Sequence, residues 1–165
     1  MSRQQVCVSG AGSWGPALAL VLARSGARDV WLVARDEAQV LEIESSRENR
    51  HYLPGIKLPD NIRITSDTRA AIESIDACVY ALPCIAVDDY LPLLAAGSYP
   101  VVPACKGLHP DKPIRPDAML AKYLDMSLLA LLSGTSFAAD VAQVHPQPTT
   151  MTDAVWSQTV GHRTL

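Results

Sequence analysis

Three glycines near the amino terminus, Gly10, Gly12 and Gly15, have the spacing G-x-G-x-x-G. They follow a β-rich run at Gln5–Ser9 and precede a helical segment at Trp14–Arg24, which is the setting that this motif requires. Gly10 permits a tight strand-to-helix turn, Gly12 lets backbone approach a pyrophosphate, and Gly15 allows the helix to pack closely on the strand. Free N–H groups at the start of the helix would hold the phosphates. The segment therefore predicts dinucleotide binding; the alternative is a glycine turn that serves packing alone.

The end of the second expected strand, Val30–Ala34, indicates which dinucleotide would bind. Arg35 comes next, and a guanidinium suits the 2'-phosphate of NADP through charge-assisted hydrogen bonds. Asp36 follows and keeps NAD open, because an acidic residue here usually holds the ribose 2'-hydroxyl. The alternative for Arg35 is a solvated surface residue. The pattern favours NADP over NAD.

Two further segments could face a ligand at the carboxyl edge of the sheet. Lys106 follows the apolar run Val101–Cys105, so its ammonium could bind a substrate oxygen and stabilise negative charge; the alternative is a loop lysine in solvent. Ser136 is a natural helix N-cap, and structure alone could explain it. The N–H groups of residues 134–138 could equally form a site for an anion.

Apolar runs that alternate with amphipathic ones predict an α/β fold, a doubly wound Rossmann-like domain with a mostly parallel sheet of six or seven strands. A helix is expected over Trp14–Arg24, stopped at Gly26, and another is expected from Asp36, which would cap it. Proline-rich loops are expected at Arg50–Asp60 and Gly107–Pro116. The expected strands are Gln5–Ser9, Val30–Ala34, Arg63–Thr65, Ala77–Leu82, Val101–Cys105, Leu128–Leu132 and Thr149–Thr152.

Composition excludes several classes of function. The 165 residues carry 14 Lys and Arg against 17 Asp and Glu, a formal charge of −3, with no basic run for a nucleic acid. The longest apolar runs, such as Pro16–Ala23, are too short to cross a bilayer, so no membrane insertion is expected. The amino terminus has no signal-peptide pattern. Four separated cysteines without a C-x-x-C pair indicate no metal site and a reduced, cytoplasmic chain.

Taken together, the motifs resemble the bacterial-type NAD(P)-dependent sn-glycerol-3-phosphate dehydrogenases. The resemblance covers roughly residues 4–152 and departs at Pro16, Cys84 and Thr135, none of which removes an essential contact. Other dehydrogenases with the same turn, such as those acting on ketopantoate or pyrroline carboxylate, do not explain CKG and SGTSFA together. The matching pieces, in order, are GAGSWGPALA, Arg47-Glu48-Asn49, Tyr52–Pro59, NIRITSD, ALPC, CKG, SGTSFAADVA and PTTMT.

This resemblance implies reduction of dihydroxyacetone phosphate to sn-glycerol 3-phosphate for glycerophospholipid synthesis, by hydride transfer from NAD(P)H. It is compatible with a homodimer of the full-length proteins. The cofactor contacts that it implies are Gly10, Gly12, Ser13, Trp14, Gly15, Arg35, Tyr52, Lys106 and Ala138, and the substrate contacts are Lys106, Gly134 and Ser136.

Full-length members of that family carry a carboxyl-terminal helical domain, with a G-A-L-K-N lysine as general acid/base and an Arg-Asn pair for the phosphate. Neither motif occurs in this sequence, so no catalytic residue is assigned to this chain. We expect a binding domain at residues 1–152, a tail at 153–165 that begins a truncated unit, and an exposed apolar patch where the helical domain would pack. Alone, the chain would bind NADP(H) and turn over little or nothing. The alternative is a stand-alone NADP(H)-binding module or a non-catalytic subunit.

Overall fold

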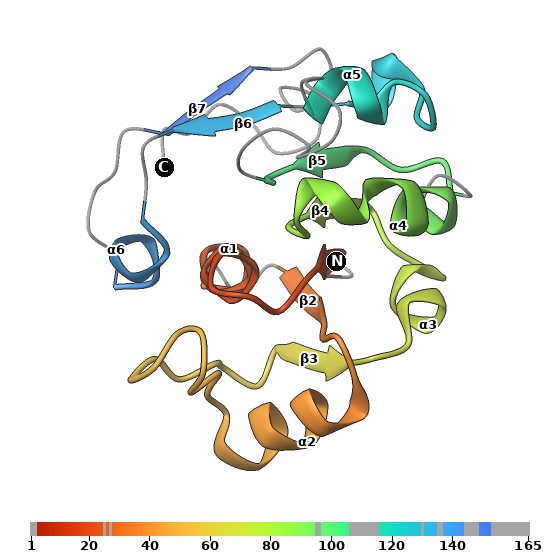
Figure 1. The fold of residues 1–165 in the computed structure, drawn as a ribbon. Helices are drawn as coiled ribbons and strands as arrows, with labels where there is room; N and C mark the ends of the chain where they lie inside the picture. The colour runs from red at the N-terminus through yellow and green to blue at the C-terminus, as the bar shows by residue number, and fades with distance from the viewer. Residues whose placement is uncertain are drawn as a thin grey trace.

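A computed structural model describes residues 3–24, 26, 28–94, 97–105, 116–129, 131–134, 137–143 and 149–152 (Figure 1). Among these residues, no helix is long and apolar enough to cross a membrane. The strands are β1 (Gln4–Ser9), β2 (Arg28–Val33), β3 (Ile62–Thr65), β4 (Ala77–Tyr80), β5 (Val101–Pro103), β6 (Leu131–Gly134) and β7 (Thr149–Thr152). The helices are α1 (Trp14–Ala23), α2 (Glu37–Ser46), α3 (Thr68–Ile72), α4 (Val87–Leu94), α5 (Pro116–Leu120) and α6 (Ala138–Ala142), with short 3-10 turns η1 (Cys84–Ala86) and η2 (Met126–Leu128).

Five strands form one parallel sheet in the order β3-β2-β1-β4-β5. The strand β1 lies at its centre, where Val8 is opposite both Leu32 of β2 and Val79 of β4. The chain moves outward from β1 in one direction through β2 and β3, and in the other through β4 and β5. The reversal of direction lies between β1 and β4, and open α/β sheets bind ligands beyond the carboxyl ends of the strands at such a point. The predicted doubly wound α/β fold is confirmed.

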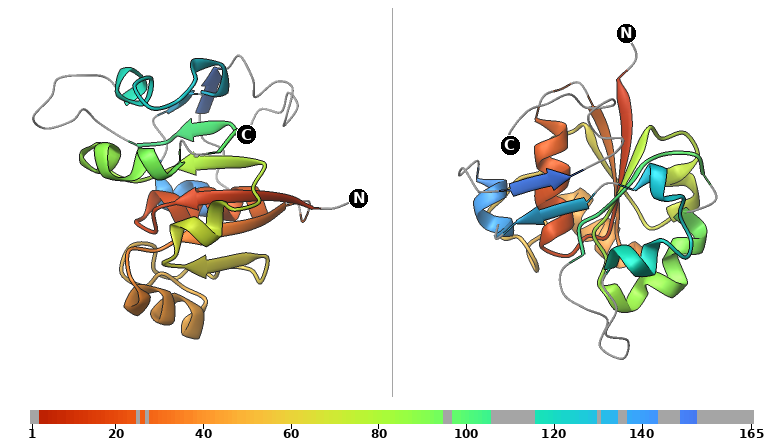
Figure 2. Two further views of the ribbon diagram at one scale, coloured as in Figure 1. Left: turned by 90° about the vertical axis from the view of Figure 1, so that its right-hand side faces the viewer. Right: turned by 90° about the horizontal axis from the view of Figure 1, so that it is seen from above.

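Helices cover both faces of this sheet, and alternate residues of β1 reach the two faces because strand side chains point to opposite sides. Val6 and Val8 belong to the core that contains α1, α2 and α6, whereas Cys7 belongs to the core that contains α3, α4 and α5. Seen along the sheet, α1 and α6 lie on one side and α4 and α5 on the other (Figure 2). Burial on both faces explains why the strands read as continuous apolar runs rather than alternating ones.

The ends of the first two helices follow the predicted local signals. After α1, Gly26 has φ +65° and its N–H donates to the Ala23 carbonyl at 3.0 Å. Before α2, the Asp36 side chain accepts the Gln39 backbone N–H at 2.9 Å, as an N-cap does. The helix start at Asp36 and the stop at Gly26 are therefore confirmed.

The prediction of six or seven strands in one sheet is wrong for the described residues. β6 and β7 pair with each other, antiparallel, as a separate two-stranded sheet. The segment before β6 meets the main sheet through a single parallel bridge, Val101 to Leu129. An apolar β-branched pattern indicates that a segment is extended and buried, but it does not specify its partner strand. Of the predicted loop at 107–116, residues 107–115 lie outside the described residues and Pro116 begins α5.

Candidate functional site

The glycine turn joins β1 to α1 at the reversal point of the sheet. Gly10 has φ +116°, and a Cβ added there would lie 2.9 Å from the Ala81 carbonyl oxygen. A Cβ on Gly15 would overlap the Gly10 carbonyl oxygen. By contrast, a Cβ on Gly12 would meet nothing within 4 Å among the described residues. The fold thus requires glycine at positions 10 and 15, while the space in front of Gly12 is open.

The amino terminus of α1 has the properties of an anion site. Ser13 at the N-cap position is exposed and makes no side-chain capping hydrogen bond within the described part of the chain, so its hydroxyl satisfies none of the first N–H groups of the helix. The first turn of α1 also carries no acidic side chain that would repel an anion. Trp14 is half-buried and packs against the core on the α1 face. The N–H groups and the helix dipole together favour a bound phosphate.

Arg35 and Asp36 lie at the carboxyl end of β2, one strand away from the glycine turn. The Arg35 side chain is 77% exposed, and its Nε lies 2.9 Å from Asp36 Oδ2. The hydrogen bond to Asp36 raises the pKa of Arg35, and the negative charge of Asp36 acts in the same direction. Asp36 also accepts the Gln39 N–H, and that hydrogen bond, followed by the one from Arg35, lowers the pKa of Asp36. Each carboxylate oxygen of Asp36 therefore accepts one hydrogen bond, and the Arg35 side chain is the more exposed of the two, at 77% against 45%.

Tyr52 lies on the same rim as Arg35. Its side chain is 41% exposed, and the His51 ring packs edge-on against its ring with centroids 4.4 Å apart. The electrostatic influence of Tyr52 on Arg35 is a further, smaller cause of the raised pKa of that guanidinium. The structure thus places Arg35 and Tyr52 near each other and near the turn, and their contact with a nucleotide stays a prediction.

Two side-chain amides reach the glycine turn from elsewhere in the sequence. Gln39 Nε2 and Asn49 Nδ2 donate to the Ala11 carbonyl oxygen at 2.9 Å and 2.8 Å. Asn49 is 2% exposed and is one of the few buried polar residues described. Sequence reasoning missed both roles: Asn49 stood in a quoted motif without a function, and Gln39 was not singled out. The spacing Asp36-x-x-Gln39 is that of a capping box, which could have drawn attention to Gln39.

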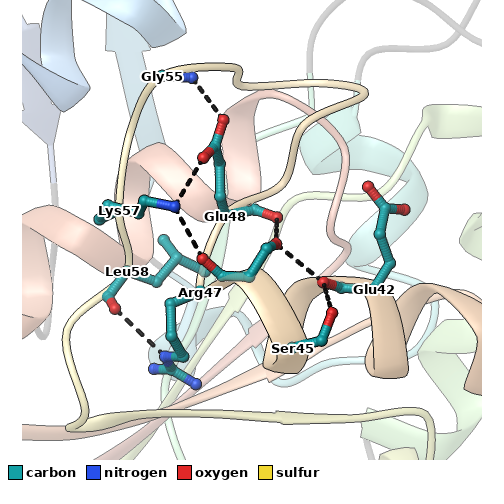
Figure 3. Close-up of polar contacts among 8 residues, drawn as sticks. Glu42, Ser45, Arg47, Glu48, Gly55, Lys57 and Leu58 are labelled. Carbon is teal, nitrogen blue, oxygen red and sulfur yellow. Dashed lines mark hydrogen bonds and ion pairs between the residues drawn. The ribbon is translucent and has the colours of Figure 1, made fainter.

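A network of charged residues shapes the loop between α2 and β3 (Figure 3). Arg47, in the left-handed region with φ 50°, donates from Nε to the Leu58 carbonyl oxygen at 3.3 Å. Glu48 accepts the Gly55 N–H at 2.8 Å and lies 2.9 Å from Lys57 Nζ. The hydrogen bond from Gly55, with a smaller contribution from Lys57, lowers the pKa of Glu48. Arg47 and Glu48 therefore hold the loop that presents Asn49 and Tyr52.

The predicted substrate side is described only in part. Lys106 and Ser136 lie outside the described residues, whereas Gly134 ends β6, where it pairs with Thr149. Ala138 begins α6, and Figure 1 shows α1 and α6 end-on beside each other. Arg24, which follows α1, donates to the Val141 carbonyl oxygen at 3.2 Å, so the carboxyl ends of the two helices meet. Ala138 therefore lies toward the end of α1 that carries the glycine turn.

Cys105, at this edge of the sheet, is unsuited to act as a thiolate nucleophile. Burial and a hydrogen bond to Cys84 raise the pKa of Cys105 to about 12, so its thiol is protonated at neutral pH. Cys7 and Cys78 lie opposite each other in β1 and β4, and their hydrogen bond and burial raise the pKa of Cys78. All four cysteines are free thiols. Within the described part of the chain, no group of three or more His, Cys, Asp or Glu side chains could hold a metal ion.

Comparison with known proteins agrees with this geometry. The family model described as NAD-dependent glycerol-3-phosphate dehydrogenase N-terminus matches residues 5–159. The chain is 34% identical to the glycerol-3-phosphate dehydrogenase of Bacillus pumilus over 154 residues, which cover 90% of this chain and 44% of that protein. It is 40% identical to the enzyme of the same name from a Bradyrhizobium species over 152 residues, which cover 90% of this chain and 45% of that protein.

Solved structures show the same arrangement of elements. The crystal structure of glycerol-3-phosphate dehydrogenase from Coxiella burnetii superposes with a TM-score of 0.81 at 27% identity, covering 92% of this chain and 47% of that one. The Plasmodium falciparum glycerol-3-phosphate dehydrogenase structure, at 23% identity and a TM-score of 0.78, supports the fold. The chain spans about half the length of the relatives that it matches. On the family match and the shared fold, the chain belongs to the NAD-dependent glycerol-3-phosphate dehydrogenase N-terminus family.

Proposed function

We propose that this chain is the nucleotide-binding part of a glycerol-3-phosphate dehydrogenase and binds NADP(H) at the glycine turn. The observation that carries the proposal is the open space at Gly12 beside the uncapped start of α1. A pyrophosphate there would accept N–H groups from residues 12–15, with Ser13 and Trp14 as flanking contacts. The binding domain would extend over residues 1–152.

Selection of NADP over NAD would come from Arg35. Its guanidinium is exposed at the carboxyl end of β2, and its partner Asp36 is already engaged as the cap of α2. A 2'-phosphate would compete with the Asp36 carboxylate for Arg35 and would gain a charge-assisted hydrogen bond. Tyr52, on the same rim, would contact the nucleotide, and Ala138 would contact it from α6.

For the whole protein we propose reduction of dihydroxyacetone phosphate to sn-glycerol 3-phosphate. When bound, the nicotinamide supplies the hydride, and the residues of this chain bind and orient. Lys106, Gly134 and Ser136 would hold the substrate next to the cofactor, and Lys106 would touch both. The proton donor and the phosphate clamp would come from a helical portion outside this sequence, so this chain alone would turn over little or nothing. The free thiols fit a reducing, cytoplasmic setting.

Titration calorimetry with NADPH and NADH tests the cofactor proposal. We expect NADPH to bind more tightly than NADH, and Arg35→Ser to weaken NADPH binding roughly tenfold or more while it leaves NADH binding nearly unchanged. Arg69→Ser is the matched control, because it removes an exposed arginine of α3 on the opposite face of the sheet. An equal loss of NADPH and NADH affinity in Arg35→Ser would contradict the assignment of Arg35 to the 2'-phosphate.

A second assay separates the enzyme from a stand-alone binding module. Reduction of dihydroxyacetone phosphate by NADPH is followed with this chain alone and after mixing with the separately expressed carboxyl-terminal half of the Bradyrhizobium relative. Turnover only in the mixture would support an enzyme in which this chain supplies the nucleotide-binding groups and the other half supplies the proton donor. Tight NADPH binding without turnover in the mixture would favour the module.

A further inference from the structure

We propose that Gln39 and Asn49 are positioning residues that aim the glycine turn at the pyrophosphate and fix the nucleotide-contacting rim to it. The proposal rests on the proposed function and concerns the same site. It starts from one carbonyl group. The carbonyl oxygen of Ala11 accepts hydrogen bonds from two side-chain amides, Gln39 Nε2 at 2.9 Å and Asn49 Nδ2 at 2.8 Å. The two donors lie 28 and 38 residues away in the sequence, so this is a tertiary contact.

The direction of the Ala11 carbonyl decides the direction of the Gly12 N–H. The described backbone has no cis peptide bond, and in a trans peptide the C=O of one residue and the N–H of the next point opposite ways. Two donors on the Ala11 carbonyl therefore fix the Gly12 N–H on the opposite side of that peptide, and a Cβ on Gly12 would meet nothing within 4 Å among the described residues. They also draw the partial negative charge of the carbonyl away from an incoming phosphate.

Each amide is oriented by its own oxygen. Gln39 Oε1 accepts the Arg35 backbone N–H at 2.9 Å, and Asn49 Oδ1 accepts the Tyr52 backbone N–H at 3.2 Å. A flipped amide would set its oxygen against the Ala11 carbonyl oxygen, which is unfavourable. The NH₂ groups of both amides therefore point toward the Ala11 carbonyl oxygen.

The same two side chains tie both rim residues to the turn. Gln39 connects Arg35 to Ala11, and Asn49 connects Tyr52 to Ala11, so the proposed 2'-phosphate and pyrophosphate contacts share one rigid support. Burial strengthens the Asn49 link, because at 2% exposure water cannot replace the hydrogen bond that the amide makes. The distance between the pyrophosphate contacts and the 2'-phosphate contact is thereby set before NADPH binds.

The test compares isosteric variants in which a carboxylate oxygen replaces the donating NH₂ group and adds one negative charge. In Asn49→Asp and Gln39→Glu the carboxylate keeps the acceptor for the Tyr52 or Arg35 N–H but loses the donor to Ala11. We expect the Kd for NADPH to rise roughly tenfold or more in each. Binding of adenosine 2'-monophosphate, which has no pyrophosphate, should change less than threefold in the same variants. A purely structural defect would not separate these two ligands.

The matched control is Asn61→Asp. Asn61 Nδ2 also donates to two backbone carbonyl oxygens, those of Ala23 at 2.9 Å and Arg28 at 3.0 Å, but at the amino end of the sheet. This variant should lose stability while its folded fraction keeps the NADPH affinity of the original chain. Folding of every variant is checked by circular dichroism, and Gln39→Glu, at a half-buried position, decides the matter if Asn49→Asp does not fold.

Three outcomes would overturn the inference. NADPH affinity could stay unchanged in folded Asn49→Asp and Gln39→Glu. The affinities for NADPH and adenosine 2'-monophosphate could fall equally in these variants, or the Asn61→Asp control could lose NADPH affinity to the same extent. Either result would mean that Gln39 and Asn49 have a structural role only. If the unsubstituted chain binds no nucleotide, the proposed function itself fails, and that result is distinct because it appears before any substitution.

Discussion

At the residue scale, the three glycines of the turn have two different physical roles. Gly10 and Gly15 are required by the folded chain, because a side chain at either would meet backbone atoms of Ala81 or of Gly10 itself. Gly12 is not required by any described contact. A glycine that the fold does not need, at the start of an uncapped helix, is what an approaching ligand would need.

Alanine at Gly12 and Gly15 separates these roles. Gly15→Ala should lower the free energy of unfolding by about 1–3 kcal/mol, because the turn must shift to admit the Cβ. Gly12→Ala should change the free energy of unfolding by less than about 1 kcal/mol. It should still raise the Kd for NADPH roughly tenfold or more. Urea unfolding and titration calorimetry give the two quantities. Gly12→Ala that binds NADPH normally would show that the phosphates do not approach this residue.

At the element scale, two helices and the loop that carries Tyr52 are held by polar contacts at their ends. Asp36 caps α2, Asp67 caps α3 through the Arg69 and Ala70 N–H groups, and Glu48 closes the loop before β3. For Asp36 and Glu48, the hydrogen bonds from backbone N–H groups favour the charged carboxylate and lower its pKa. Acid should therefore loosen the ends of elements before it disturbs the apolar core.

The loop that presents Tyr52 should depend on pH through Glu48. Its pKa is lowered in the folded chain, so its contribution to stability is complete above the ordinary value of 4.5 and is lost as pH falls below it. Glu48→Gln should flatten the fall in stability between about pH 5 and pH 3, measured by urea unfolding. Glu44→Gln, an exposed position in α2, controls for the change in net charge. A pH dependence unchanged by Glu48→Gln would contradict this account of the loop.

Element prediction succeeded where local signals are strong and failed where they are weak. Strands β1 to β5 were located because apolar β-branched runs lie between turn residues, and hydrogen bonds at Ala34, Ala81 and Ala104 extend the pairing beyond the strand ends, close to the predicted limits. The helices α3, α4 and α5 were not identified. α3 and α5 have five residues each, and α4 contains Pro92, which is atypical of a helix interior.

At the scale of the whole molecule, a nucleotide bound between the turn and the rim would connect the ends of β1 and β2 with the loop before β3. Among the described residues, the large hydrophobic side chains that remain exposed belong to different elements: Leu41 in α2, Tyr52 in the loop before β3, Ile85 in η1 and Phe137 before α6. Whether they mark one surface for a helical domain stays a prediction. Ligand binding is the more direct whole-molecule test, because any ligand that prefers the folded state stabilises it.

Thermal unfolding should therefore report nucleotide binding. At an NADPH concentration of about 100 times Kd, the stabilisation is about 2.7 kcal/mol, which corresponds to a Tm increase of roughly 5–10 °C for a chain of this size. NADH at the same concentration should raise the Tm less, and Gly12→Ala should remove most of the NADPH effect. An unchanged Tm at saturating NADPH would contradict binding to the folded domain.

The sequence by itself determined the glycine turn, the stop of α1, the cap of α2 and the doubly wound class, because each depends on a local pattern of backbone freedom, capping or periodicity. Its motifs, taken in order, carried the resemblance to the family. Only the tertiary structure decided that β6 and β7 pair apart from the main sheet. It alone showed that Gln39 and Asn49 converge on the Ala11 carbonyl. Both outcomes depend on which distant segments meet, and contacts between distant segments leave no periodic trace in either segment.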